Sequence, residues 1–158
     1  MLDKLTGKEA TGLVGSFEGV FKGLPHLPKG VIDFLVSIAP WLAGLGGLLS
    51  LFSGISSVFM TSRRNEFWAY VDRYAGVNSA YFTVIGVVAI LLGLLYLMAF
   101  TPLKNKKLSG WMYLFWGQLL SILSGVAGLV FGYGGIVGTL IGAAIGFYVL
   151  FEVKASYK

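Results

Sequence analysis

Hydrophobic positions in this chain fall into four long runs separated by short polar stretches. The runs cover about residues 31–61, 80–100, 111–132 and 134–153. A helix needs about 20 apolar residues to cross the roughly 30 Å hydrocarbon core of a bilayer, and each run meets that length. The pattern therefore predicts an all-α integral membrane protein in which residues 31–158 form one bundle of four transmembrane helices.

Prolines and glycines mark the expected ends of these helices. Residues 25–28 read PHLP, and two prolines so close together break any helix that precedes them. Pro40 is expected to kink the first spanning helix, Pro102 to end the second, and Ser109 to cap the third. Residues 131–135 read FGYGG, which predicts a tight hairpin between the third and fourth helices.

Residues 1–30 show a weaker amphipathic pattern. Apolar side chains recur at helical spacing at Leu13, Phe17, Val20, Phe21 and Leu24, and Lys4, Lys8 and Lys22 lie on the opposite side. This predicts an interfacial helix that touches lipid through Phe17, Val20 and Phe21. Five glycines weaken such a helix, so a flexible tail is the alternative reading.

Composition supports a membrane location. The chain is 56% apolar and only 12% charged, whereas soluble domains carry about 25% charged residues. Residues 1–30 carry scattered charges and no apolar core of signal-peptide length, so no cleavable signal peptide is expected.

The basic residues are distributed unequally between the two sides. If the N-terminus is cytoplasmic, nine lysines lie inside and three arginines lie outside. The positive-inside rule then predicts that both termini are cytoplasmic. Arg63 and Arg64 lie directly at a membrane exit on the outer side, and they would move inside in the alternative reading, in which residues 31–61 re-enter the membrane instead of crossing it. Lys104, Lys106 and Lys107 are expected at the lipid interface, where anionic headgroups rather than nucleic acid account for the net charge of +5.

Small residues recur at every fourth position in three of the runs, the spacing of a glycine zipper. They are Gly134, Gly138, Gly142 and Gly146 in the last run, Gly46, Ser50 and Gly54 in the first, and Gly117, Ser121 and Gly125 in the third. Such stripes let helices approach closely in a membrane. The stripe in the fourth helix is expected to pack against the stripe in the third.

The first and third runs also resemble each other. Residues 46–54 read GGLLSLFSG and residues 117–125 read GQLLSILSG. Duplication of a helical hairpin would produce this match, and so would chance in a chain rich in leucine, glycine and serine. The sequence leaves both explanations open.

Few residues suggest chemistry. The chain has no cysteine and a single histidine, so neither a metal site nor a cofactor is expected. Asp33 and Glu152, near helix ends, are either solvated there or form a paired proton or cation site. Gln118 is expected to bond another helix or, with Thr139, to line a polar path. No catalytic set is visible, and an enzyme is not expected.

Two stretches carry a family resemblance. PLKNKKLSGW at 102–111 and IGFYVLFEVK at 145–154 resemble a group of small multi-helix inner-membrane proteins of poorly cultured bacteria. The resemblance covers roughly the last 60 residues. It implies a location in the bacterial inner membrane and carries no activity with it.

Two functional interpretations follow from these features. The first is a structural or accessory membrane protein whose partners are lipids and another membrane protein. The second is a homo-oligomeric channel or small transporter, in which the glycine stripe of the fourth helix faces a second copy. A pore needs polar groups throughout the membrane depth, and these runs offer few, which favours the first interpretation.

Overall fold

The structure, a computed structural model, contains four long helices in the part of the chain that it describes. That part comprises residues 25–62 and 79–158, together with Gly12, residues 14–16 and 18–19, Gly23, residues 69–70 and Arg73. The helices are α3 (Lys29–Ser62), α5 (Ser79–Lys104), α6 (Leu108–Val130) and α7 (Ile136–Lys154). Each is long and apolar enough to cross a membrane, so the prediction of four helices of that length and composition is confirmed.

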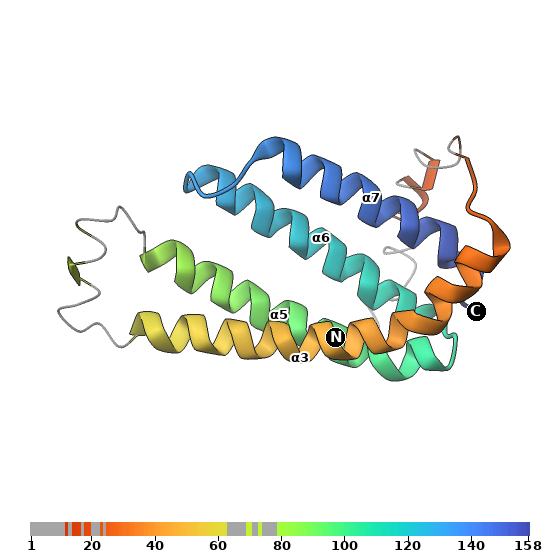
Figure 1. The fold of residues 1–158 in the computed structure, drawn as a ribbon, viewed down its shortest axis with the longest axis horizontal. Coiled ribbons are helices and arrows are strands. Elements are labelled where there is room, and N and C mark those ends of the chain that lie inside the picture. The colour runs from red at the N-terminus through yellow and green to blue at the C-terminus, as the bar shows by residue number, and fades with distance from the viewer. Residues whose placement is uncertain are drawn as a thin grey trace.

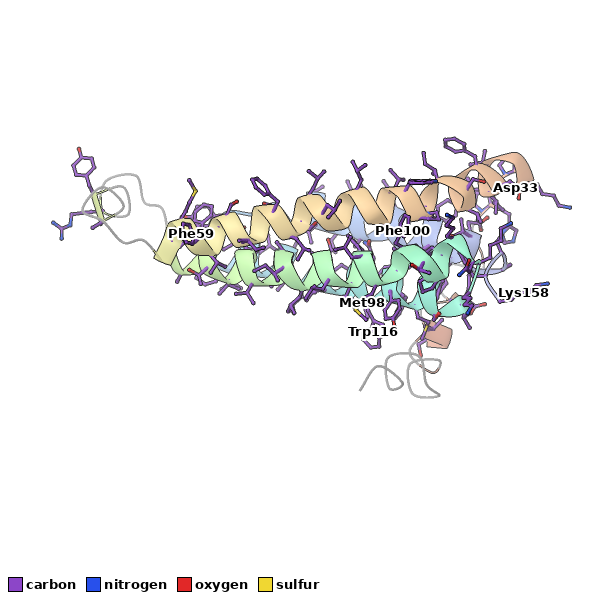
Figure 2. All side chains as sticks on the ribbon, turned by 90° about the horizontal axis from the view of Figure 1, so that it is seen from below. Asp33, Phe59, Met98, Phe100, Trp116 and Lys158 are labelled. Atoms are coloured by element: carbon purple, nitrogen blue, oxygen red, sulfur yellow. The ribbon has the colours of Figure 1, made fainter. Side chains whose placement is uncertain are left out.

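The helices form two antiparallel hairpins, α3 with α5 and α6 with α7 (Figure 1). α5 packs on α6 and joins the hairpins, whereas α3 and α7 meet only marginally. The α5–α6 turn and the segment that follows α7 lie at the same end of the bundle, because the backbone of Lys158 bonds to Lys106 and Leu108. We call this the basic end; its lysines are Lys104, Lys106, Lys107, Lys154 and Lys158. Asp33 and Lys158 lie at this end and Phe59 lies at the other (Figure 2).

Most apolar side chains point outward. Phe52 is 75% exposed, and α3 exposes Leu45, Leu48 and Leu49 in the same way. The largest fully buried side chains are instead Trp111, Phe115 and Leu103, near the basic end. A fold with a small interior core and an apolar exterior suits a lipid environment, where outward leucines cost nothing.

The turn between α6 and α7 depends on Gly132. This residue has a φ of 77°, the left-handed region that glycine tolerates best. The Tyr133 amide donates to the Gly128 carbonyl at 2.8 Å, and the Gly132 amide donates to the Leu129 carbonyl at 3.2 Å. This pair of bonds defines a Schellman motif. The predicted tight hairpin at residues 131–135 is confirmed.

The turn between α5 and α6 repeats this motif with Lys106 in the left-handed position, at a φ of 51°. The Lys107 amide donates to the Pro102 carbonyl at 2.9 Å, and the Lys106 amide donates to the Leu103 carbonyl at 3.0 Å. The expectation that Pro102 ends the helix is wrong, because α5 continues to Lys104. A proline in the last turn removes a single amide donor, which the helix tolerates.

The start of α6 also differs from expectation. α6 begins at Leu108, and its N-cap residue is Lys107, which makes no capping bond through its side chain. Ser109 therefore lies inside the first turn. The backbone of Lys158 caps the helix instead, because its carbonyl accepts a hydrogen bond from the Leu108 amide at 2.9 Å.

α3 is the longest helix and contains Pro40. Its 34 residues span about 50 Å, more than the hydrocarbon core of a bilayer. Figure 1 shows its first turns curving toward the end of α7. A proline inside a helix produces such a bend because it lacks an amide donor and its ring crowds the preceding turn.

Candidate functional site

Glycines on both helices bring the backbones of α3 and α5 together along a contact that we call the glycine seam. A Cβ added to Gly54 would lie 2.6 Å from the Gly86 carbonyl oxygen, and one added to Gly47 would lie 3.0 Å from the Gly93 carbonyl oxygen. The approach is reciprocal, since a Cβ on Gly93 would lie 2.8 Å from the Gly47 carbonyl oxygen. The two backbones therefore touch directly.

The seam has a period of seven rather than four. Gly47 and Gly54 are seven residues apart on α3, and Gly86 and Gly93 are seven apart on α5. A seven-residue repeat keeps one face toward a neighbouring helix, whereas steps of four drift about 40° each around the helix. Of the expected Gly46, Ser50 and Gly54, only Gly54 belongs to this backbone contact. The seven-residue spacing was the signal that sequence reasoning missed.

The stripe expected in α6 is divided between two neighbours. A Cβ on Gly117 would lie 2.6 Å from Tyr96 of α5, whereas Gly125 faces Thr139 of α7. Ser121, between them, is exposed. Gly125 lies eight residues after Gly117 and is therefore rotated about 80° around the helix, which is enough for it to face α7 instead of α5.

The glycine stripe that runs from Gly134 to Gly146 is also divided, because only some of its glycines contact another helix. Gly134 lies against Gly128, and Gly146 lies against Gln118, so these two glycines meet α6. Gly138 and Gly142 have no atom within 4 Å of an added Cβ. The expectation that the whole stripe packs on the third helix is therefore wrong for Gly138 and Gly142.

The residues through which α7 packs are instead spaced alternately four and three positions apart. These are Thr139, Ala143, Gly146, Leu150 and Val153. All five are buried or half-buried, whereas Val137, Ile141 and Ile145 are exposed. Alternating steps of four and three are the pattern of helices that cross at a shallow angle. The crossing geometry, not the glycine count, selects the contact face.

A polar clip joins the segment before α3 to the end of α7. The Glu152 carboxylate accepts a bond from the Leu27 amide at 2.8 Å and lies 2.9 Å from His26 Nδ1. Its side chain is only 8% exposed, whereas that of His26 is 77% exposed. One turn earlier, the Tyr148 hydroxyl donates to the Pro25 carbonyl. The prolines hold this segment extended, so its backbone groups can face α7.

A second ion pair extends the clip. Lys154 binds Glu18, and its ammonium group also lies 5.6 Å from the centre of the Trp111 ring. The Trp111 indole donates to the Leu150 carbonyl at 2.7 Å from a fully buried position. Trp111 is therefore a core residue that joins α6 to α7.

The proposed pairing of Asp33 with Glu152 is wrong. Both oxygens of Glu152 are engaged by His26 and Leu27, while Asp33 is exposed. The contact partners are 126 residues apart, and no local spacing signals such a contact. The residue that pairs with the Glu152 carboxylate through its side chain is therefore His26.

The structure does not bring Gln118 and Thr139 together. Gln118 lies against Gly146, whereas Thr139 lies against Gly125 and bonds the Gly135 carbonyl of its own helix at 3.1 Å. Gly125 is seven residues beyond Gln118 on α6, a rise of about 10 Å. These two side chains therefore face different levels of the bundle.

Lys104, Lys106 and Lys107 are exposed at the basic end. Both backbone groups of Lys158 are engaged there, because its amide also donates to the Lys106 carbonyl at 2.9 Å. The other expected lipid-interface residues, Phe17, Val20 and Phe21, lie outside the described residues. In the same segment Val14 is described and is buried, 3% exposed.

Comparisons of the chain with models of protein families, with curated proteins and with solved structures find no match. Within the described part of the chain, no group of three or more histidine, aspartate and glutamate side chains is placed to hold a metal ion. The class that the fold defines is a bundle of four helices, each able to span a membrane.

Proposed function

We propose that this chain is a structural or accessory integral membrane protein that packs through small-residue helix contacts. The observation that carries the proposal is the α3–α5 seam, where Gly54 and Gly86 let two backbones touch. Helix pairs held this closely form rigid units without needing polar groups in the membrane. The outward apolar side chains of α3 then contact lipid or another membrane protein.

The placement of polar groups argues against a transport path within one copy. A path needs polar side chains at successive depths, and Gln118 and Thr139 face different helices. In the described part of the chain, no polar or charged residue is buried in the core. A single bundle therefore offers an ion or polar solute little compensation for losing its water.

A channel made of several copies is the second candidate, and the exposed face of α7 favours it. Gly138 and Gly142 lie open between the exposed Val137, Ile141 and Ile145. A helix from a second copy would find there a shallow groove between large side chains.

Measurement of mass and leakage in lipid separates the two candidates. We expect the purified protein in nanodiscs to be monomeric, and its proteoliposomes to retain potassium and a small fluorescent anion as well as empty vesicles do. Gly142→Leu is expected to leave both results unchanged. An oligomer whose leak disappears with Gly142→Leu would replace the proposal with the channel.

For location, we propose the inner membrane of a bacterium, with both termini in the cytoplasm and anionic lipids around the basic end. The gathering of Lys104, Lys106, Lys107, Lys154 and Lys158 at one end supports this orientation. The chain has no cysteine, so single-cysteine variants are clean reporters.

In intact cells, a membrane-impermeant thiol reagent is expected to label Gly135→Cys and not Asn105→Cys. Permeabilised cells are expected to label both variants, which controls for access to the thiols. Labelling of Asn105→Cys alone in intact cells would reverse the orientation.

A further inference from the structure

A cavity of about 310 Å³ lies among all four helices of the bundle. Its lining residues are Ala39, Leu42 and Ala43 of α3, Tyr96 of α5, Leu114 and Gln118 of α6, and Gly146 and Leu150 of α7. The volume falls at the lower end of the range for small-molecule sites. The walls are apolar apart from the amide of Gln118 and the hydroxyl of Tyr96.

Both polar groups lie deep within the span. Gln118 is ten residues from the start of α6, a rise of about 15 Å, and Tyr96 is eight residues from the end of α5, about 12 Å. Within the described part of the chain, the structure gives neither group a hydrogen bond. An amide or hydroxyl without a partner in hydrocarbon costs several kcal/mol in transfer scales, so a partner entering the cavity would be favoured.

The small residues around the cavity keep these two side chains in place. A Cβ on Gly146 would lie 2.5 Å from Gln118 Nε2, so glycine at this position leaves room for the amide. The Tyr96 ring lies between Gly117 of α6 and Gly46 of α3, since added Cβ atoms would lie 2.6 Å and 4.0 Å from it. The cavity walls therefore orient both groups through packing.

The cavity opens to the surface of the bundle beside Leu42, a lining residue of α3 that is 60% exposed. That surface faces the bilayer if the four helices span it, so a ligand would enter from lipid. No lysine, arginine, aspartate, glutamate or histidine is among the lining residues. A charged headgroup or a free carboxylate would be left uncompensated there.

We propose that this cavity binds a neutral, lipid-soluble carbonyl compound. The carbonyl oxygen accepts from the Gln118 amide and the Tyr96 hydroxyl, and the apolar body lies against Ala39, Ala43 and Leu150. Such a ligand supplies what the cavity lacks, an acceptor for two donors, and adds no charge. Water alone would satisfy the donors and leave the apolar walls unfilled.

The test uses an alkyl benzophenone, a ketone that inserts into nearby C–H bonds when irradiated. We expect saturable labelling of α5 or α6 peptides around Tyr96 and Leu114 in nanodiscs. The competitors 2-undecanone and undecane have the same chain length and differ by the carbonyl. The ketone is expected to compete about tenfold better, the effect of roughly one to two hydrogen bonds.

Three variants connect the labelling to the cavity. Gln118→Leu is expected to weaken labelling about tenfold and to be at least as stable as the parent without ligand, because it removes a polar group that has no partner. Ala39→Leu is expected to abolish labelling by filling the cavity while both polar groups remain. Tyr96→Phe is expected to weaken it about threefold, and the matched Tyr81→Phe, outside the cavity, to leave it unchanged.

An apolar groove between α5 and α6, lined in part by Met98 and Trp116, serves as an internal reference (Figure 2). Its walls are apolar apart from the Trp116 indole, and none of the variants changes a lining residue, so its labelling is expected to be the same in all of them. Equal competition by undecane and 2-undecanone would overturn the proposal. So would labelling confined to this groove, or cavity labelling unchanged in both Gln118→Leu and Ala39→Leu.

Discussion

The α3–α5 seam predicts that adding one methyl group at Gly54 weakens the fold. A Cβ at this position would lie 2.6 Å from the Gly86 carbonyl oxygen and 2.8 Å from the Ile90 amide nitrogen. Both are backbone atoms, so no side chain can rotate away. Ordinary contact begins near 3.4 Å, and the helices must therefore separate by about 0.8 Å.

The magnitude follows from two opposing effects. A separation of 0.5–1 Å removes a quarter to a half of each dispersion contact, and overpacking of this kind costs about 1–3 kcal/mol. Alanine also favours the helix over glycine by up to about 1 kcal/mol. The net loss for Gly54→Ala is thus about 1 kcal/mol of unfolding free energy, the middle of a range of roughly 0–2 kcal/mol.

Gly142→Ala is the matched control. This glycine is also inside a helix, but nothing lies within 4 Å of its added Cβ. It receives the same gain in helix propensity without the clash, so we expect it to be neutral or stabilising by up to about 1 kcal/mol. The difference between the two variants removes the propensity effect and isolates the cost of the seam, about 2 kcal/mol.

The assay is equilibrium unfolding in mixed micelles, followed by near-ultraviolet circular dichroism of the buried Trp111 and Phe115 cluster. Thermal unfolding in nanodiscs gives an independent ranking. If Gly54→Ala is as stable as Gly142→Ala, the backbones do not touch at Gly54. The account of the seam would then be refuted.

Three further predictions concern the basic end. Lys106→Gly is expected to stabilise the fold by about 0.5–1 kcal/mol, because Lys106 is a non-glycine residue in the left-handed region, where its Cβ is strained. An unchanged midpoint of thermal unfolding would contradict this. Glu152→Gln is expected to lower the free energy of unfolding by about 1–2 kcal/mol, because it weakens charge-assisted hydrogen bonds. The control Asp33→Asn, at an exposed carboxylate, is expected to change it by less than about 0.5 kcal/mol. Equal effects of the two variants would contradict the role given to the polar clip. Burial raises the pKa of the Tyr157 phenol above its ordinary 10.0. The stabilisation that comes from keeping this phenol neutral is therefore fully present below about pH 10 and is lost as the pH rises through the pKa in the folded protein. Tyr157→Phe is expected to reduce this alkaline loss, and identical pH profiles would contradict it.

The number of long helices and their approximate extent could be predicted because they depend on local properties, although the end of α5 and the start of α6 differ by a few residues from the prediction. Run length determines whether a helix can span, and the glycines at 131–135 specify a turn that needs a left-handed residue at Gly132. The distribution of the lysines predicts that both termini lie on one side of the membrane. None of these inferences depended on knowing which helix neighbours which.

The packing faces could not be predicted in the same way, because they depend on the angle at which helices cross. Steps of four put Gly138, Gly142 and Gly146 on one slowly rotating stripe, and only Gly146 meets α6. A shallow crossing selects steps of seven, which Gly47 and Gly54 satisfy with Gly93 and Gly86. Both spacings are present in the sequence, and the contact geometry decides between them.

The described interactions differ between the two ends of the bundle, and this difference indicates how it opens. The basic end is held by bonds from Glu152, Lys154 and Trp111 that tie α7 to the segment before α3 and to α6. At the opposite end, the α6–α7 turn meets α5 through the stacked rings of Tyr81 and Tyr133, with centroids 4.5 Å apart. An aromatic pair contributes about 0.5–1.5 kcal/mol beyond its buried area, less than a set of charge-assisted bonds. Separation of the hairpins should therefore begin at the opposite end and widen the side on which α3 and α7 diverge, while the clip at the basic end stays closed.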